Sequence, residues 1–364
     1  MKPPALLIRA IVIAAGAVSL SGARAQPPAM APVTVTTTEV AAGVYQFTVA
    51  SDGYVEQLNS VAIVTDVDVV VFDTTTRPST AATILAEIRR LTSKPVRYIV
   101  NSHWHPDHWS GNQVFAAAFP GAEIIATEQE RDFMMNMAPS WATTLPRALA
   151  AQTAAVEGQN TSGMTAQGTP LTPERRARDD LDLVRTRDMV AEQANVIRTF
   201  PTLTYSDRLT LHHGGREFRF MSVTGDAAGT TVLFLPRERI LITGDVVSHP
   251  LPYYTPPLSQ HSRSIRELMR LDFDLVIPGH GPAFRDRAYM TLEADLFDEL
   301  ARQVVAALRN GAVSIDEVQA AIHVDSFRDR FARGDAEIAA LFPLFVQGMV
   351  RRIYVENRDT KEIR

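Results

Sequence analysis

Apolar residues form short runs in the first third of the chain, and the spacing within each run predicts its secondary structure. Runs at residues 44–49, 60–65 and 69–72 predict strands. The last two are rich in valine and isoleucine with few polar positions, which is typical of strands covered on both faces of a sheet. Over residues 79–91 the apolar positions recur at helical spacing. Pro95 ends that predicted helix, and a further strand is expected at residues 96–100.

Two long helical regions interrupt and follow this alternating pattern. Residues 129–199 are rich in alanine, arginine and methionine at helical spacing, broken at 158–173 by glycine, threonine and proline. Strand patterns resume at residues 208–212, 217–223, 230–235, 240–243 and 275–277. We therefore predict one α/β domain at residues 39–289, with a helical insertion at about 129–199, and a helical C-terminal segment at 290–364.

The N-terminal segment predicts export. Residues 1–25 carry Lys2 and Arg9, then an apolar run too short to span a bilayer, then a small-residue cleavage site that ends at Ala25. A linker rich in proline and threonine is predicted at residues 26–38. We expect a periplasmic or secreted protein that is cleaved after Ala25 and has no membrane attachment afterwards.

Composition limits the classes of molecule that the protein is expected to bind. The chain has no cysteine, so its stability has to come from an apolar core rather than from disulfide bonds. Its formal net charge is −5, whereas nucleic-acid binding needs a basic surface. We expect a small-molecule substrate and no nucleic acid, and the sequence leaves the oligomeric state open.

Three of the nine histidines lie in the segment HWHPDH, which begins at His103, just after the strand predicted at 96–100. Side chains two positions apart on an extended segment point the same way, so His103 and His105 can bind one metal ion. Asp107 and His108 lie on the following turn, where they can face a second ion. This mixture of imidazole and carboxylate favours borderline metals.

Two further polar residues follow apolar strands later in the chain. Asp245 comes after a strand and a glycine in LITGDVV, and His280 does the same in LVIPGHGP. One aspartate or histidine at such a place is commonly a cap or turn residue. Two of them, in a chain that also holds the histidine cluster, indicate a composite metal site.

Together these motifs resemble the metallo-β-lactamase superfamily, whose hydrolases have a four-layer αββα sandwich. The matching pieces are FDTTT, SHWHPDH, TGD and PGHGP. The resemblance implies that fold here, with the helical insertion and the C-terminal helices added, and a centre of two divalent metal ions, most simply zinc. The implied ligands are His103 and His105 for the first metal, Asp107, His108 and His280 for the second, and Asp245 as the bridge between them.

One position departs from the pattern of that family. The third histidine of the first metal usually stands in Gly-His-Thr-x-Gly, and here the segment TGDAAGTT places Asp226 at that position and Ala227 at the threonine. Asp226 can bind the first metal through oxygen, weaken that site so that only the second fills, or leave the protein catalytically impaired. The retained glycine spacing favours ligation, and a carboxylate there makes manganese or iron better competitors with zinc.

Other residues are expected beside the metals. Asp73 follows the strand at 69–72, where it can fix the turn, and by resemblance it belongs to the shell that orients the metal ligands. His249 and Tyr253 follow Asp245 on a loop at the same sheet edge, so they are candidates for substrate contact. Apolar residues between positions 133 and 141 of the insertion line an access channel, form the core of the insertion or make a dimer contact.

The resemblance implies a hydrolase whose metal-bound hydroxide attacks an ester-, lactone- or amide-like bond, β-lactams included. No cysteine and no Gly-x-Ser-x-Gly segment offers a covalent nucleophile. Asp107 is expected to relay a proton to the leaving group, and the aspartate at 245 is closer to the lactonase- and thioesterase-like branches. Two alternatives are a redox di-iron protein, which His105 disfavours, and a metal-binding or interaction protein of the same fold that has lost catalysis.

Overall fold

The described strands form one continuous 12-stranded sheet whose two halves, called here the first and the second sheet, pack face to face. A computed structural model describes residues 33–51, 56–165, 168–252 and 258–358, and the strand order within them is β7-β6-β5-β4-β3-β12-β11-β10-β9-β8, with β2 paired to β3 and β1 to β2. The two sheets meet at the pairing of β3 with β12, where His280 lies opposite Leu58. The first sheet contains β1 (Val35–Ala41), β2 (Val44–Ser51), β3 (Glu56–Val64), β4 (Val69–Phe72), β5 (Val96–Val100), β6 (Glu123–Thr127) and β7 (Leu203–Tyr205). The second contains β8 (Arg208–His213), β9 (Arg216–Thr224), β10 (Ala228–Leu235), β11 (Ile240–Ser248) and β12 (Leu275–His280).

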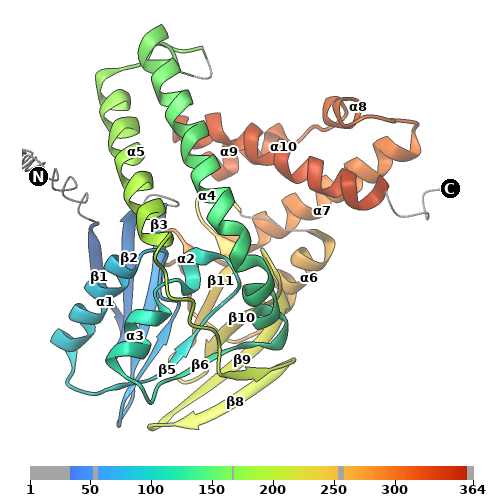
Figure 1. Cartoon of the computed structure of the whole chain (residues 1–364). Helices are drawn as coiled ribbons and strands as arrows, with labels where there is room; N and C mark the ends of the chain where they lie inside the picture. The colour runs from blue at the N-terminus through green and yellow to red at the C-terminus, as the bar shows by residue number, and fades with distance from the viewer. Residues whose placement is uncertain (1–32, 52–55, 166–167, 253–257, 359–364) are drawn as a thin grey trace, which may run out of the picture. The chain divides into compact units, whose positions relative to one another are not determined.

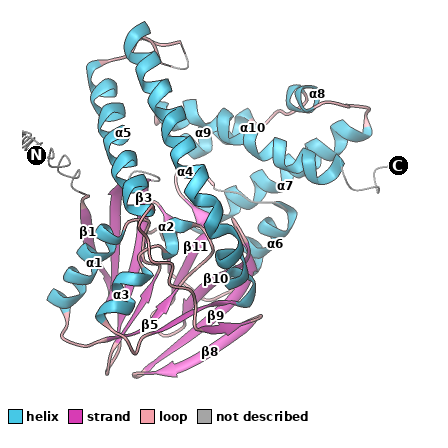
Figure 2. Cartoon of the chain, in the orientation of Figure 1, coloured by secondary structure: helices cyan, strands magenta, loops and turns pink. Residues whose placement is uncertain are grey.

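Helices cover the outer face of each sheet (Figures 1 and 2). On the first sheet these are α1 (Pro78–Leu91) and α3 (Asn112–Ala118), and on the second they are α6 (Leu258–Leu268) and α7 (Arg287–Arg309). The alternation along β4 shows the layering, because Val69 and Val71 pack under α1 while Val70 and Phe72 pack between the sheets. A strand buried on both faces has no polar side, which explains its continuous apolar run. The predicted αββα sandwich is confirmed.

The helical insertion is a hairpin of α4 (Glu128–Ser162) and α5 (Pro173–Gln193). Thr127 and Thr172 cap the two helices by accepting hydrogen bonds from the backbone N–H groups three residues on. The break predicted to begin at residue 158 begins only after Ser162, at the left-handed Gly163. Gly158 stays inside α4 because one exposed glycine weakens a helix by only about 1 kcal/mol.

The C-terminal segment is helical, as predicted. It continues from α7 into α8 (Ile315–Ala320), α9 (Asp325–Ala332) and α10 (Ala336–Arg358). By length and composition α10 is apolar enough to cross a membrane. Phe342, Met349 and Ile353 on one of its faces are nevertheless buried in the same core cluster as α7, as in a core helix of a globular domain.

Three features of the first sheet differ from the sequence prediction. The linker predicted at 26–38 is wrong from Val35 onward, because β1 begins there and pairs antiparallel with β2. Its two valines and three consecutive threonines are β-branched residues that suit a strand. Strands β6 and β7 were not predicted; β7 has only three residues, too short for a periodic pattern. The proposed signal segment and Tyr253 lie outside the described residues.

Candidate metal centre

The seven predicted metal ligands lie at the ends of strands or just beyond them. His103 and His105 follow β5, and Asp107 and His108 lie on α2 (Pro106–Trp109), a single turn that starts with proline after the extended His105. Strands β4, β5 and β6 are parallel to one another, and β11 is parallel to β12. Their carboxyl ends therefore bring residues that are distant in sequence to one edge. Asp226 lies between β9 and β10, Asp245 within β11, and His280 at the end of β12.

Glycines let these segments approach closely. A Cβ atom on Gly279 would lie 1.9 Å from Oδ1 of Asp245, and one on Gly244 would lie 2.5 Å from Cβ of Ser102. Any side chain at either position would push Asp245 or the histidine segment away. The glycine before Asp245 and the one before His280 are therefore required by the close packing of the centre.

Four of the seven side chains form a first group: His103, His105, Asp226 and Asp245. Nε2 of His103 lies 2.8 Å from Nδ1 of His105, which in turn lies 3.0 Å from Oδ2 of Asp226. Oδ2 of Asp245 lies 3.7 Å from Nε2 of His103. Asp226 is thus placed where the third ligand of a first ion would stand, despite its shorter side chain.

Asp107, His108 and His280 form a second group. Oδ2 of Asp107 lies 3.3 Å from Nε2 of each histidine, and Oδ2 of Asp245 lies 3.4 Å from the same two nitrogens. A tetrahedral zinc ion bound at about 2.0–2.1 Å holds its ligands roughly 3.3 Å apart. The second group has this spacing, and Asp245 faces both groups.

Unpaired polar atoms support a cation at this place. Nε2 of His108 and Oδ1 of Asp245 are buried and have no hydrogen-bond partner among the described residues. Buried polar atoms are almost always paired, so these two indicate a ligand of another kind. Imidazole nitrogens and carboxylate oxygens suit zinc, iron or manganese. The residues therefore fit two divalent cations.

Asp107 and Asp245 are ionised. Burial alone would raise the pKa of Asp107 and of Asp245, but the neighbouring histidines His108 and His280 outweigh it and hold both pKa values well below the usual range. Burial and the nearby histidines hold the pKa of His103 well below its ordinary value. In the metal-free protein the same carboxylates raise the pKa of His108 well above its ordinary value and that of His280 to about 10. Metal binding requires neutral imidazole, so it has to release these protons.

Asp73 orients the second group, as the sequence suggested. It is buried, and its carboxylate accepts hydrogen bonds from the backbone N–H of Ser102 at 2.7 Å and from the Ser102 hydroxyl at 2.8 Å. Its Oδ2 lies 2.7 Å from Nδ1 of His108. A carboxylate on Nδ1 keeps the proton there and leaves Nε2 free for a metal.

Two asparagines that bracket the histidine segment were not singled out from the sequence. The side-chain amides of Asn101 and Asn112 donate to each other's oxygens at 3.0 and 2.8 Å, and Asn101 also donates to the backbone oxygen of His108. Both are fully buried. They close the loop that carries the ligands. Their positions at the two ends of NSHWHPDHWSGN could have identified them from the sequence.

Glu130 is a second residue that sequence reasoning missed. It is fully buried in the first turn of α4, with the backbone of Trp104 as a hydrogen-bonding neighbour. Burial, aided by the charge of Asp226, raises its pKa well above the ordinary value. No local pattern distinguished it, because glutamate in the first turn of a helix is common.

Aromatic rings stand on the open side of the centre. His105 is the most exposed of the seven residues, with 22% of its side chain accessible, and its ring centroid lies 4.4 Å from that of Trp104 and 6.5 Å from that of Trp141. Trp109 is buried against Met134 of α4, whereas Met135 and Met137 are exposed. The apolar residues of the insertion thus divide between the core and the surface.

His249 lies beside the second group. Its backbone N–H donates to the backbone oxygen of His280, and its ring packs against Tyr289 of α7 at 4.9 Å. Burial lowers its pKa, as does the nearby Arg333. Its contact with substrate stays a prediction.

Comparisons with known proteins bear on this arrangement. The sequence model of the metallo-beta-lactamase superfamily matches residues 53–280. A linear primary-alkylsulfatase from a Pseudomonas species is 27% identical over 222 residues, which cover 58% of this chain and 39% of the relative.

Solved structures show the same fold. The stereoselective inverting sec-alkylsulfatase Pisa1 from Pseudomonas sp. gives a TM-score of 0.58 at 18% identity, over 88% of this chain and 50% of its own. A beta-lactamase domain protein from Burkholderia ambifaria gives 0.57 at 19% identity, over 89% of each chain. The chain therefore spans half or less of the length of the alkylsulfatases that it matches.

Proposed function

Because the chain belongs to the metallo-β-lactamase superfamily, we propose that it is a hydrolase that binds two divalent cations, most simply zinc, and cleaves an ester-like bond of a small molecule. One observation carries the proposal. The two groups of imidazole and carboxylate ligands, each with its ligand atoms within 4.8 Å of one another, stand on either side of the single carboxylate of Asp245.

The residues divide between the two ions. His103, His105 and Asp226 would hold the first, Asp107, His108 and His280 the second, and Asp245 both. When bound, such a pair of cations lowers the pKa of a water and polarises an oxygen of the substrate. The protein supplies rigidity, since Asp73 fixes the tautomer of His108. Trp104 and Trp141 limit the access of bulk water at the His105 side.

Asp107 is better described as a ligand than as the proton relay that the sequence suggested. Its Oδ2 lies 3.3 Å from both His108 and His280, and its pKa is held well below the usual range. A carboxylate in that state is a poor acid near neutral pH. The leaving group then has to depart as an anion or take its proton from solvent.

Among ester-like substrates, we propose alkyl sulfates first. The relative with 27% identity is a linear primary-alkylsulfatase, and an alkyl sulfate presents an anionic head to the cations and a leaving alcohol on an apolar chain. Lactones, carboxylic esters and β-lactams are the other substrates of the test. The mildly acidic composition and the N-terminal pattern support an exported protein that acts on a small molecule rather than on nucleic acid.

The test combines metal analysis with a substrate panel. The purified chain is reconstituted with zinc, manganese or iron and assayed against alkyl sulfates, lactones, carboxylic esters and β-lactams. We expect close to two equivalents of metal and hydrolysis of alkyl sulfates. His280→Ala should lower kcat/KM more than about 100-fold, since even residues that only orient ligands are worth 10–100-fold, and His323→Ala, at an exposed histidine, should not.

Two results would contradict the proposal. Failure to bind metal after reconstitution would favour an interaction protein that has lost catalysis. Metal binding without hydrolysis of any substrate in the panel would favour a metal-binding protein with Asp226 as the impairing change.

A further inference from the structure

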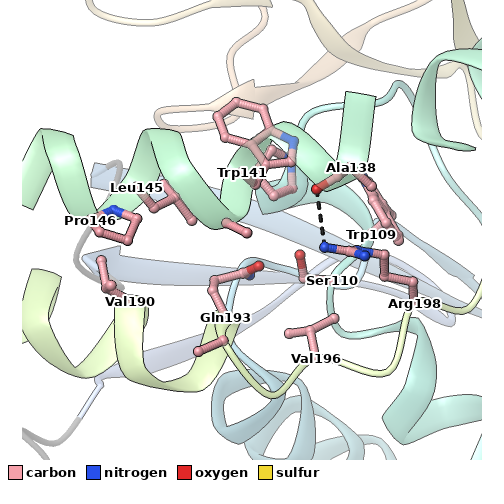
Figure 3. A pocket seen from close by; sticks show the side chains of 13 residues that line it. Trp109, Ser110, Ala138, Trp141, Leu145, Pro146, Val190, Gln193, Val196 and Arg198 are labelled. Carbon is pink, nitrogen blue, oxygen red and sulfur yellow. Dashed lines mark hydrogen bonds between the residues drawn. The ribbon is translucent and has the colours of Figure 1, made fainter. Parts of the chain in front are cut away.

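A cavity of about 280 Å³ lies between α2 and the helical hairpin of α4 and α5 (Figure 3). Its lining is mostly apolar and includes Trp109, Leu145 and Val190. Of its polar residues, Arg198 is engaged by the backbone oxygen of Ala138, to which it donates at 3.2 Å. The cavity therefore offers a mainly apolar surface to whatever enters it.

The short helix α2 separates this cavity from the metal centre. Asp107 and His108 of α2 belong to the second ligand group, whereas Pro106 and Trp109 line the cavity. Trp141 joins the two places, because it lines the cavity and its ring lies 6.5 Å from that of His105. His105 is the most exposed of the ligand residues, so Trp141 links the cavity to the most accessible ligand of the centre.

We propose that this cavity binds the unbranched apolar tail of the substrate while its anionic ester head lies at the metal centre. The inference rests on the proposed function and specifies its substrate class as long-chain rather than short-chain esters. The volume equals roughly nine water molecules at about 30 Å³ each, which is room for an alkyl chain of medium length. Water in the cavity finds few hydrogen-bond partners in its mainly apolar lining. An alkyl chain that enters removes from water both its own apolar surface and that of the lining.

Chain length is the first variable of the test. The metal-loaded protein is assayed with ethyl, butyl, hexyl and octyl sulfate, all below the concentrations at which they form micelles. Full burial of a methylene group corresponds to about a fourfold gain in kcat/KM. We expect kcat/KM to rise along the series by between twofold and fourfold for each methylene.

Filling the cavity should remove this gain. Val190→Phe places a larger ring in the lining from α5, and Ala142→Phe does so from α4, so that one variant remains if the other fails to fold. Val184→Phe adds the same ring to an exposed position of α5 that does not line the cavity, and serves as the control. We expect the cavity variants to lose at least tenfold with octyl sulfate and less than twofold with ethyl sulfate, and the control to match the wild type. Equal losses with both substrates, or no loss with either, would overturn the proposal.

A binding measurement separates this inference from the proposed function. The chain has three tryptophans; Trp109 and Trp141 line the cavity and Trp104 lies beside His105. Titration with octyl sulfonate, which has no ester bond to cleave, should change their fluorescence at concentrations where ethyl sulfonate does not, and Val190→Phe should weaken the response. Such binding without any hydrolysis would refute the proposed function and keep the cavity as a tail site. Hydrolysis of alkyl sulfates without a fluorescence response to octyl sulfonate and without dependence on chain length would keep the proposed function and refute the tail site.

Discussion

The substitution Asp73→Asn tests whether a carboxylate outside the ligand set controls the metal centre. The side chain of Asp73 accepts three hydrogen bonds, two from Ser102 and one from Nδ1 of His108 at 2.7 Å. Asparagine keeps an oxygen for Ser102 but presents an amide N–H to His108. The imidazole must then accept on Nδ1 and carry its proton on Nε2, where it cannot bind metal.

The expected effect is a tenfold to 100-fold loss of affinity at one of the two metal sites, or about 1.4 to 2.7 kcal/mol. The backbone is spared, because Asp73 has a φ of 58° and asparagine adopts this left-handed conformation readily. Burial raises the pKa of Asp73, so its charge is costly in the metal-free protein. The effect is therefore sought in metal affinity rather than in stability.

Competition with a chromophoric chelator measures the two affinities. Asp68→Asn is the matched control, since Oδ2 of Asp68 lies 2.6 Å from Nε2 of His213 at the opposite end of β4. The reasoning is refuted if Asp73→Asn binds both metals within twofold of the wild type, or if Asp68→Asn loses as much.

Three further predictions concern single residues. Asp226→His should tighten the first site and raise activity, measured by metal titration and kcat/KM; unchanged values would place Asp226 outside the ligand set. Gly279→Ala should abolish binding at both sites because its Cβ would lie 1.9 Å from Asp245, and retained metal content would contradict the packing described above. Glu293 is buried in α7, and burial raises its pKa well above normal. The folded protein therefore favours the protonated form, and its free energy of unfolding decreases as the pH rises above about 4.3, the ordinary pKa of glutamate. In denaturant unfolding of the metal-free protein, Glu293→Gln should lose less stability than the wild type between pH 4.5 and 8, and parallel curves would exclude this cause.

Much of the metal centre was predictable because its information is local. Because His103 and His105 are two positions apart after a strand, their side chains point the same way. A glycine before Asp245 or His280 marks a place where two segments of the backbone pack closely. The placement of Asp226 beside His105 was expected from the resemblance to the family motif, whose glycine spacing this segment keeps.

What could not be predicted depends on contacts between distant segments. Strand β1 is defined by its pairing with β2, and nothing in its threonine-rich sequence separates an edge strand from a linker. Glu130 looks like an ordinary residue of a first helical turn until the fold buries it. The cavity is made by three elements that are brought together only in the folded chain.

Chemistry and selectivity therefore have different origins in this chain. The strands of the sandwich supply Asp245 and His280, and loops at strand ends supply the other ligands apart from those on α2, whereas the insertion supplies most of the cavity. Among the described elements, α2 contributes to both, with Asp107 and His108 on one side and Pro106 and Trp109 on the other. On the two proposals made above, substitutions in α4 or α5 change which substrate tail is accepted and leave the metal ligands in place, whereas substitutions in α2 alter both at once.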